Sequence, residues 1–141
     1  MSIELHIFLP EAAIPTIQTW QTAIDAAEFP LKLGTDVDLH SHRGFLPAMY
    51  KDKETGFELY FDAATDIIAD YPHISGKVGV RTECATFRWG GNLMEMCAAL
   101  SAAASLAKAS GGLYFYPDDD LLYEADEALS VTRKELGSVP I

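Results

Sequence analysis

The chain has 141 residues, 49% of them hydrophobic, and carries 10 Lys and Arg against 21 Asp and Glu, a net charge of −11. This length predicts one domain, residues 1–141, whose core needs no disulfide or metal, and it excludes an eightfold β/α barrel, which takes about 250 residues. The negative charge argues against nucleic-acid backbones and anionic membranes as partners, and it suits a basic protein.

The first third of the chain has the pattern of a strand, a helix and a second strand. Ile3–Leu9 alternates apolar and polar residues at first and stops at Pro10, which predicts a strand. Apolar residues recur at three- and four-residue spacing over residues 14–27, which predicts a helix that Pro30 ends. Leu31–Leu33 is then expected to form a short strand.

The middle of the chain predicts a hairpin. Residues 45–50 and 57–63 have the composition of strands, and the polar residues 51–56 between them are expected to form the turn, with Gly56 free to adopt positive φ. Residues 36–43 are polar and predict no definite element. Residues 63–69 are expected to form a short helix.

The second half of the chain is expected to contain a long strand followed by the longest helix. Residues 78–89 predict a strand with a bulge or bend, because neither of its faces is cleanly apolar. Residues 93–109 are rich in Ala, Leu and Met and predict a helix. Asn92 is its expected N-cap, with Glu95 as the capping-box partner, and a pair of glycines ends it.

The last elements complete an α+β pattern. Residues 113–116 predict a strand, residues 117–120 a turn, and residues 124–136 a helix with acidic residues early and basic residues late. The order of the elements therefore predicts a single α+β domain with a mostly antiparallel sheet and helices packed on one face.

The expected location is the cytoplasm. The first residues lack the basic start and long apolar run of a signal peptide, and the most apolar region is interrupted by charged residues. Two cysteines do not make a disulfide framework in a chain of this length. Cys97 lies in the apolar helix and is expected to be a small buried residue, and Cys84 has no activating neighbour in the sequence.

One short string has the residue types of a metal site. In an extended strand Asp36, Asp38, His40 and His42 would point the same way, and imidazoles beside carboxylates can bind zinc. The string from Asp38 to His42 also resembles the first metal motif of the polymerase-and-histidinol-phosphatase hydrolases, in which His40 and His42 would be ligands. That family's barrel does not fit this length, and the only later histidine is His73. A polar loop without metal is the other interpretation.

An acidic stretch near the C-terminus offers a docking surface. It has six carboxylates in ten residues with no basic residue among them. One interpretation is a solvated turn followed by a helix start that the macrodipole favours. The other is a negative patch that docks on a basic protein and speeds encounter. Its residues are Asp118, Asp119, Asp120, Glu124, Asp126 and Glu127.

Aromatic residues flank the longest helix on both sides. Phe87 and Trp89 precede it, and the run from Tyr114 to Tyr116 follows it. On adjacent strands these rings would pair in the sheet. An aromatic binding patch is the alternative.

Four glycine- and aromatic-containing segments stand out between residues 44 and 136, namely residues 44–47, 54–60, 87–91 and 111–114. Together they resemble small bacterial domains of unknown function, some of which look like immunity proteins that neutralise the toxin of a toxin system. With the acidic charge and no catalytic constellation, the resemblance implies a non-enzymatic binding protein that neutralises a toxin or another basic protein partner without a cofactor. A small metal-dependent hydrolase using Asp38, His40 and His42 is the alternative, and homo-oligomer formation is left open.

Overall fold

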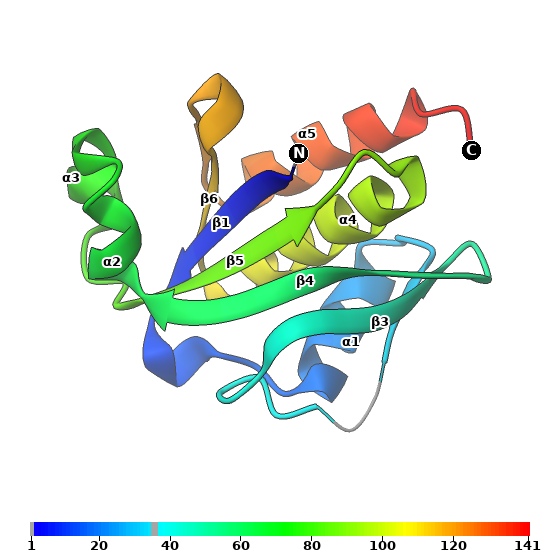
Figure 1. The fold of residues 1–141 in the computed structure, drawn as a ribbon, viewed down its shortest axis with the longest axis horizontal. Coiled ribbons are helices and arrows are strands. Elements are labelled where there is room, and N and C mark those ends of the chain that lie inside the picture. Colours follow the sequence, from blue (N-terminus) through cyan, green and yellow to red (C-terminus); the bar gives the residue numbers. More distant parts are fainter. Residues whose placement is uncertain (1, 35–36) are drawn as a thin grey trace.

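The backbone is organised around one antiparallel sheet. The computed structural model describes residues 2–34 and 37–141, and the strands in that part of the chain all belong to this sheet. They are β1 (Ile3–Leu9), β2 (Leu31–Leu33), β3 (Arg43–Tyr50), β4 (Lys53–Ala63), β5 (Glu83–Trp89), β6 (Leu113–Tyr116) and β7 (Leu121–Tyr123). Their order is β2-β3-β4-β5-β1-β6-β7, so β1 lies between two strands from much later in the chain (Figure 1).

Helices cover the two faces of the sheet unequally. α1 (Ile17–Ala26), α4 (Leu93–Ser110) and α5 (Ala125–Gly137) pack on one face and bury the main core with it (Figure 1). The short helices α2 (Ala64–Ile68) and α3 (Ser75–Val78) cover only one end of the opposite face, where a second, smaller apolar cluster is buried. The predicted α+β domain with a mostly antiparallel sheet is confirmed, and α2 and α3 add this local cover.

Strand alternation decides which side chains join the main core. On β1, Leu5, Ile7 and Leu9 belong to the main core, whereas Phe8 belongs to the second cluster on the other face. On β4, Phe57 and Leu59 are core residues, and Glu58 between them faces away from the helices. The sheet therefore has an apolar face and a mainly polar face.

α4 begins and ends where local signals predict. The Glu95 N–H donates to the Asn92 side-chain oxygen at 3.1 Å, and Gly111 follows the helix in the left-handed conformation, with φ of 67°. Residues 97–107 are buried without a break. The Trp20 indole N–H of α1 donates to the Ala102 carbonyl at 2.9 Å and ties the two helices together. Among the described residues, no helix combines the length and apolar character that crossing a bilayer requires.

The β3–β4 hairpin is present, but its turn is shorter than predicted. Lys51 and Asp52 form the turn, with φ of 51° and 64°, and Tyr50 pairs directly with Lys53. Two residues with positive φ make a turn whose twist matches that of the flanking strands. Residues 53–55 were expected in the turn because they are polar, but they form the start of β4. Strand pairing uses backbone hydrogen bonds, so exposed strand positions can carry polar side chains.

The predicted long strand over residues 78–89 is wrong over residues 78–82. α3 ends at Val78, Gly79 has φ of 60°, and β5 begins only at Glu83. Val78 is buried in the second cluster, so its apolar character reflects helix packing and not strand pairing. The short strand β7, which the sequence did not indicate, pairs with β6 through Tyr114 and Tyr123.

The close packing of α4 can be tested with two matched substitutions. Ala103 is fully buried, so Ala103→Leu should destabilise the fold by about 1–3 kcal/mol, because a well-packed core cannot absorb three extra carbons without strain. Ala109 is exposed on the same helix, and Ala109→Leu is the control. Urea unfolding measures both, and equal midpoints would contradict the tight contact.

Candidate functional site

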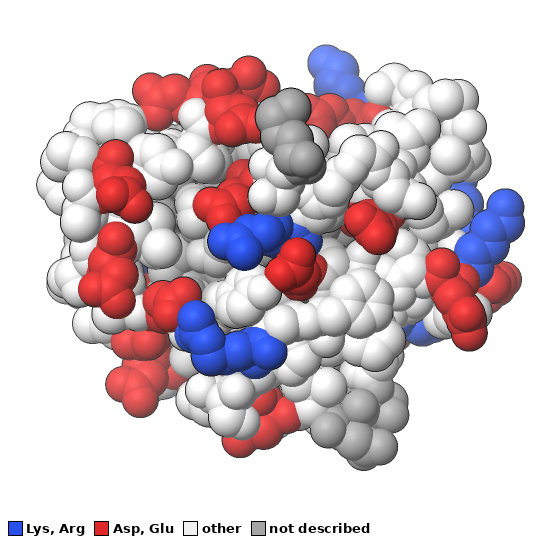
Figure 2. All heavy atoms as spheres, in the orientation of Figure 1, with Lys and Arg blue, Asp and Glu red and all other residues white. Residues whose placement is uncertain are grey.

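The face of the sheet away from α1, α4 and α5 is open over β3, β4 and the first part of β1. Polar side chains occupy its middle, and we call six of them the polar cluster. Figure 2 shows this face, with basic side chains near its centre bordered by acidic ones. Glu4 on β1, Arg88 on β5 and Glu58 on β4 are aligned across the three neighbouring strands. The polar cluster consists of Glu4, Arg43, Glu58, Tyr60, Asp62 and Arg88.

Ion pairs and an aromatic ring organise the polar cluster. The Arg88 Nε donates to a Glu4 carboxylate oxygen at 2.8 Å, and Arg43 donates to an Asp62 carboxylate oxygen at 2.9 Å. Both guanidinium carbons lie 5.3 Å from the centroid of the Tyr60 ring, which therefore lies between two cations. Each arginine is neutralised by its own carboxylate.

A buried histidine lies beneath the polar cluster. His6 on β1 is 2% exposed, and its Nδ1 lies 2.9 Å from the Thr86 hydroxyl oxygen. Its Nε2 is buried without a hydrogen-bond partner in the described part of the chain, and the nearest carboxylate oxygen, from Glu4, is 3.9 Å away. Burial lowers the pKa of His6 to about 4, with Glu4 opposing that shift and Arg88 adding to it. The imidazole is therefore neutral at pH 7.

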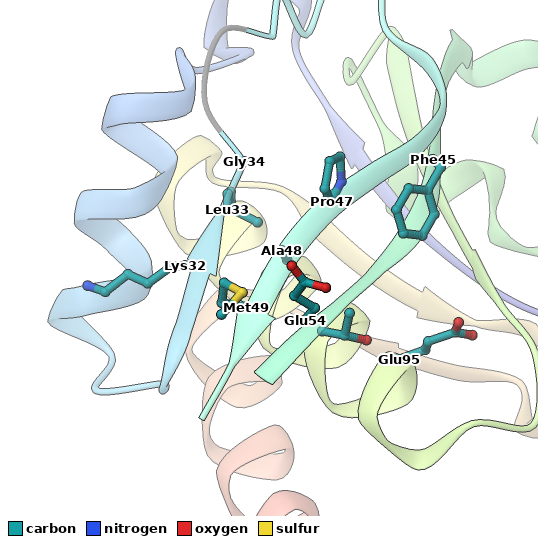
Figure 3. A pocket seen from close by; sticks show the side chains of 10 residues that line it. Lys32, Leu33, Gly34, Phe45, Pro47, Ala48, Met49, Glu54 and Glu95 are labelled. Atoms are coloured by element: carbon teal, nitrogen blue, oxygen red, sulfur yellow. The ribbon is translucent and has the colours of Figure 1, made fainter. Parts of the chain in front are cut away.

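An apolar groove adjoins the polar cluster on the β3 side (Figure 3). Phe45 is 56% exposed and Met49 is 37% exposed, and both side chains line this groove of about 540 Å³. The Phe45 ring lies against Gly56 of β4, so closely that a Cβ at Gly56 would be 2.3 Å from the ring. Carboxylates of Glu54 and Glu95 flank the groove. An exposed aromatic ring thus lies against the backbone of the neighbouring strand, at a glycine that leaves room for it.

Neither the polar cluster nor the apolar groove was predicted from the sequence. The strand over residues 45–50 was predicted, but alternation alone does not tell which face a helix will cover. The signal that could have found the groove was Gly56 in a strand, since such a glycine often marks a close approach by another group.

The acidic stretch lies at the opposite end of the sheet, in the turn after β6, in β7 and at the start of α5. Two of its six carboxylates form ion pairs with an arginine and a lysine from other segments, and a third is hydrogen-bonded to a histidine ring. A count of charges within the stretch could not reveal these partners. Asp118, Asp119 and Glu127 are exposed and form no ion pair with a described residue. The pairs are Asp120 with His73 at 2.7 Å, Glu124 with Arg81 at 3.2 Å and Asp126 with Lys108 at 2.7 Å.

The residues of the proposed metal motif do not form the extended arrangement. Leu39 is buried in the core at the centre of a turn, and the Asp38 carboxylate accepts a hydrogen bond from the His40 backbone N–H at 3.1 Å. A ring nitrogen of His42 lies 3.0 Å from a nearby backbone carbonyl oxygen. Asp36 lies outside the described residues. In the described part of the chain no three His, Cys, Asp or Glu side chains gather as a metal site would need, and the hydrolase alternative stays a prediction.

The two thiols are both free and buried. Burial raises the pKa of Cys84 and of Cys97, which keeps both protonated at neutral pH. A protonated buried thiol is a poor nucleophile.

Comparisons with models of protein families, with curated proteins and with solved structures found no match to this chain. The uncovered face of the sheet presents an apolar groove next to a paired, negatively biased polar cluster.

The burial of His6 predicts a pH dependence of stability. Because its pKa is about 4 in the folded state and about 6.5 in the unfolded state, the unfolded chain takes up the proton first, and stability falls as the pH drops through this window, by at most roughly 3 kcal/mol. His6→Gln should flatten the loss of stability between about pH 7 and about pH 5 in urea unfolding. His40→Gln, at an exposed site, is the control, and an unchanged slope in His6→Gln would refute this account.

Proposed function

We propose that this protein is a non-enzymatic binding protein that docks a basic protein partner on its uncovered sheet face, as an immunity protein docks the toxin it neutralises. The observation that carries the proposal is the exposed Phe45 ring, held against Gly56 and flanked by carboxylates. Aromatic anchors at the centre of a polar surface contribute most of the binding energy in many protein interfaces.

Rigidity supports this role for Phe45. Its ring rests on the backbone of β4, and both strands of the hairpin are hydrogen-bonded along their length. Little rotamer entropy is lost when a partner covers a side chain that is already fixed. The groove beside the ring, with Met49 on its wall, would receive an apolar side chain of the partner.

Charge supports a basic partner. Glu54 and Glu95 flank the groove, and Glu58 is directly paired with Phe45 across the strands. The arginines of the polar cluster are already matched by carboxylates, so they oppose a cationic partner only weakly. With a net charge of −11, long-range attraction should steer a basic protein to this surface.

The acidic stretch is a second contact zone in this proposal. Asp118, Asp119 and Glu127 would extend the negative surface at the far end of the sheet. We place the protein in the cytoplasm, where both buried cysteines would stay reduced.

The groove can be tested with the product of the neighbouring gene as the partner. Phe45→Ala should weaken its binding by about tenfold or more, as the loss of an aromatic hot spot does, and should abolish growth rescue if that product is toxic. Val80→Ala is the matched control, because Val80 is an exposed apolar residue, 89% exposed, away from the groove. Surface plasmon resonance at low and high salt measures the affinity and the salt dependence of the association rate. A neighbour that is toxic but neither bound nor neutralised would contradict the proposal.

The two zones can be separated by charge reversal. Glu54→Lys and Glu58→Lys should slow association at low salt, and Asp118→Lys with Asp119→Lys should do so if the acidic stretch takes part. If reversal in the acidic stretch leaves the association rate unchanged while reversal at the groove lowers it, docking is confined to the uncovered face.

A further inference from the structure

A second cavity, of about 130 Å³, lies on the helical side of the sheet between α4, α5 and the strands β6 and β7. It shares no residue with the polar cluster or the apolar groove. The lining residues that matter here are Trp89, Tyr114, Tyr116, Tyr123, Asp119 and Glu135.

Four aromatic side chains line this aromatic cavity. Trp89 and Tyr114 are almost fully buried, and the rings of Tyr114 and Tyr123 are 5.7 Å apart between centroids. The sequence left open whether these aromatics pack in the sheet or form a binding patch. Phe87 packs in the core, with its centroid 6.0 Å from that of Trp20, whereas Trp89 and the tyrosines face the aromatic cavity.

The polar groups at the aromatic cavity are acidic. Asp119 and Glu135 line it, both are exposed, and neither forms an ion pair with a described residue. Burial raises the pKa of Tyr116, and the charges of Asp118, Asp119 and Glu135 raise it further. The two carboxylates create a negative electrostatic potential at the aromatic rings, and this potential favours binding of a positive charge in the cavity.

One further group in the lining lacks a partner. Trp89 is only 4% exposed, and its buried indole N–H has no hydrogen-bond partner among the described residues. Buried polar groups are nearly always satisfied, so an orphaned donor beside a cavity calls for an explanation such as a bound molecule. A hydroxyl or carboxylate oxygen on a ligand would satisfy this donor.

We propose that the aromatic cavity binds a small alkylammonium cation that also carries a hydroxyl group, with the charged head over the tyrosine and tryptophan rings and near Asp119 and Glu135. Aromatic rings attract quaternary ammonium groups through the negative potential of their faces, and the attraction grows where water is excluded. The volume suits a headgroup of a few heavy atoms. This site shares no residue with the apolar groove, but Asp119 also belongs to the acidic stretch.

The test uses the intact protein and choline as the probe. The indole N–H signal of Trp89 in a proton–nitrogen NMR spectrum should shift saturably with choline, while that of Trp20, bonded to a carbonyl in the core, stays unchanged. Glu135→Gln should weaken choline binding about tenfold, since it removes one of two carboxylates that face the cation. Glu127→Gln, on the same helix but outside the lining, should bind choline normally.

A neutral analogue decides whether the charge matters. The tert-butyl analogue of choline has the same shape without the positive charge and should bind much more weakly. Equal binding of the two compounds would overturn the assignment of a cation site, and so would the absence of any saturable Trp89 shift at millimolar choline. Neither result bears on the docking of a protein partner.

Discussion

The close contact between α4 and the sheet is the constraint on which the rest of the structure depends. The buried run of α4 from residue 97 to 107 consists mainly of alanine and serine, so the helix backbone can approach the strands closely. The large side chains that fill this layer therefore come from its neighbours, chiefly Trp20, Phe57 and Phe87. Because interiors are packed to crystal density, this division of large and small residues sets where α1 and α5 can lie.

This arrangement accounts for the contrast between the two faces of the sheet. The helical layer covers one face of the sheet. On the other face, Phe8, Cys84 and Phe115 are apolar, and α2 and α3 pack over them. What is left is a hydrogen-bonded strand surface whose exposed side chains lie outside the main core. Such a surface is free to present an exposed ring at Phe45 and charge pairs around Tyr60. The proposed docking function depends on this freedom.

The sequence predicted what local signals determine. The Asn92 cap and the apolar helix that follows it were predicted, and so was the pairing of the hairpin strands, because capping, composition and turn chemistry act over a few residues. The predictions failed where distant segments meet. Val78 was assigned to a strand because its apolar side chain does not reveal the cluster that buries it.

Candidate sites were harder to predict for the same reason. Arg81 neutralises Glu124 from more than forty residues away, so the local charge of the acidic stretch overstated its surface charge. The string of Asp38, His40 and His42 predicted a shared direction only for an extended strand, and buried Leu39 makes a turn there instead. The aromatic cavity combines β5, β6, β7 and α5, which no single segment of sequence indicates.

The position of β1 in the sheet constrains the order in which the molecule can assemble. Ile3 pairs with Trp89 and His6 pairs with Phe115, so β1 has no strand partner until much of the chain that follows it has been made. The β3–β4 hairpin, in contrast, needs only its own residues and can form early. During synthesis, the apolar side chains and backbone edges of β1 therefore stay unpaired, and they are open to chaperones or to aggregation until β5 and β6 have emerged.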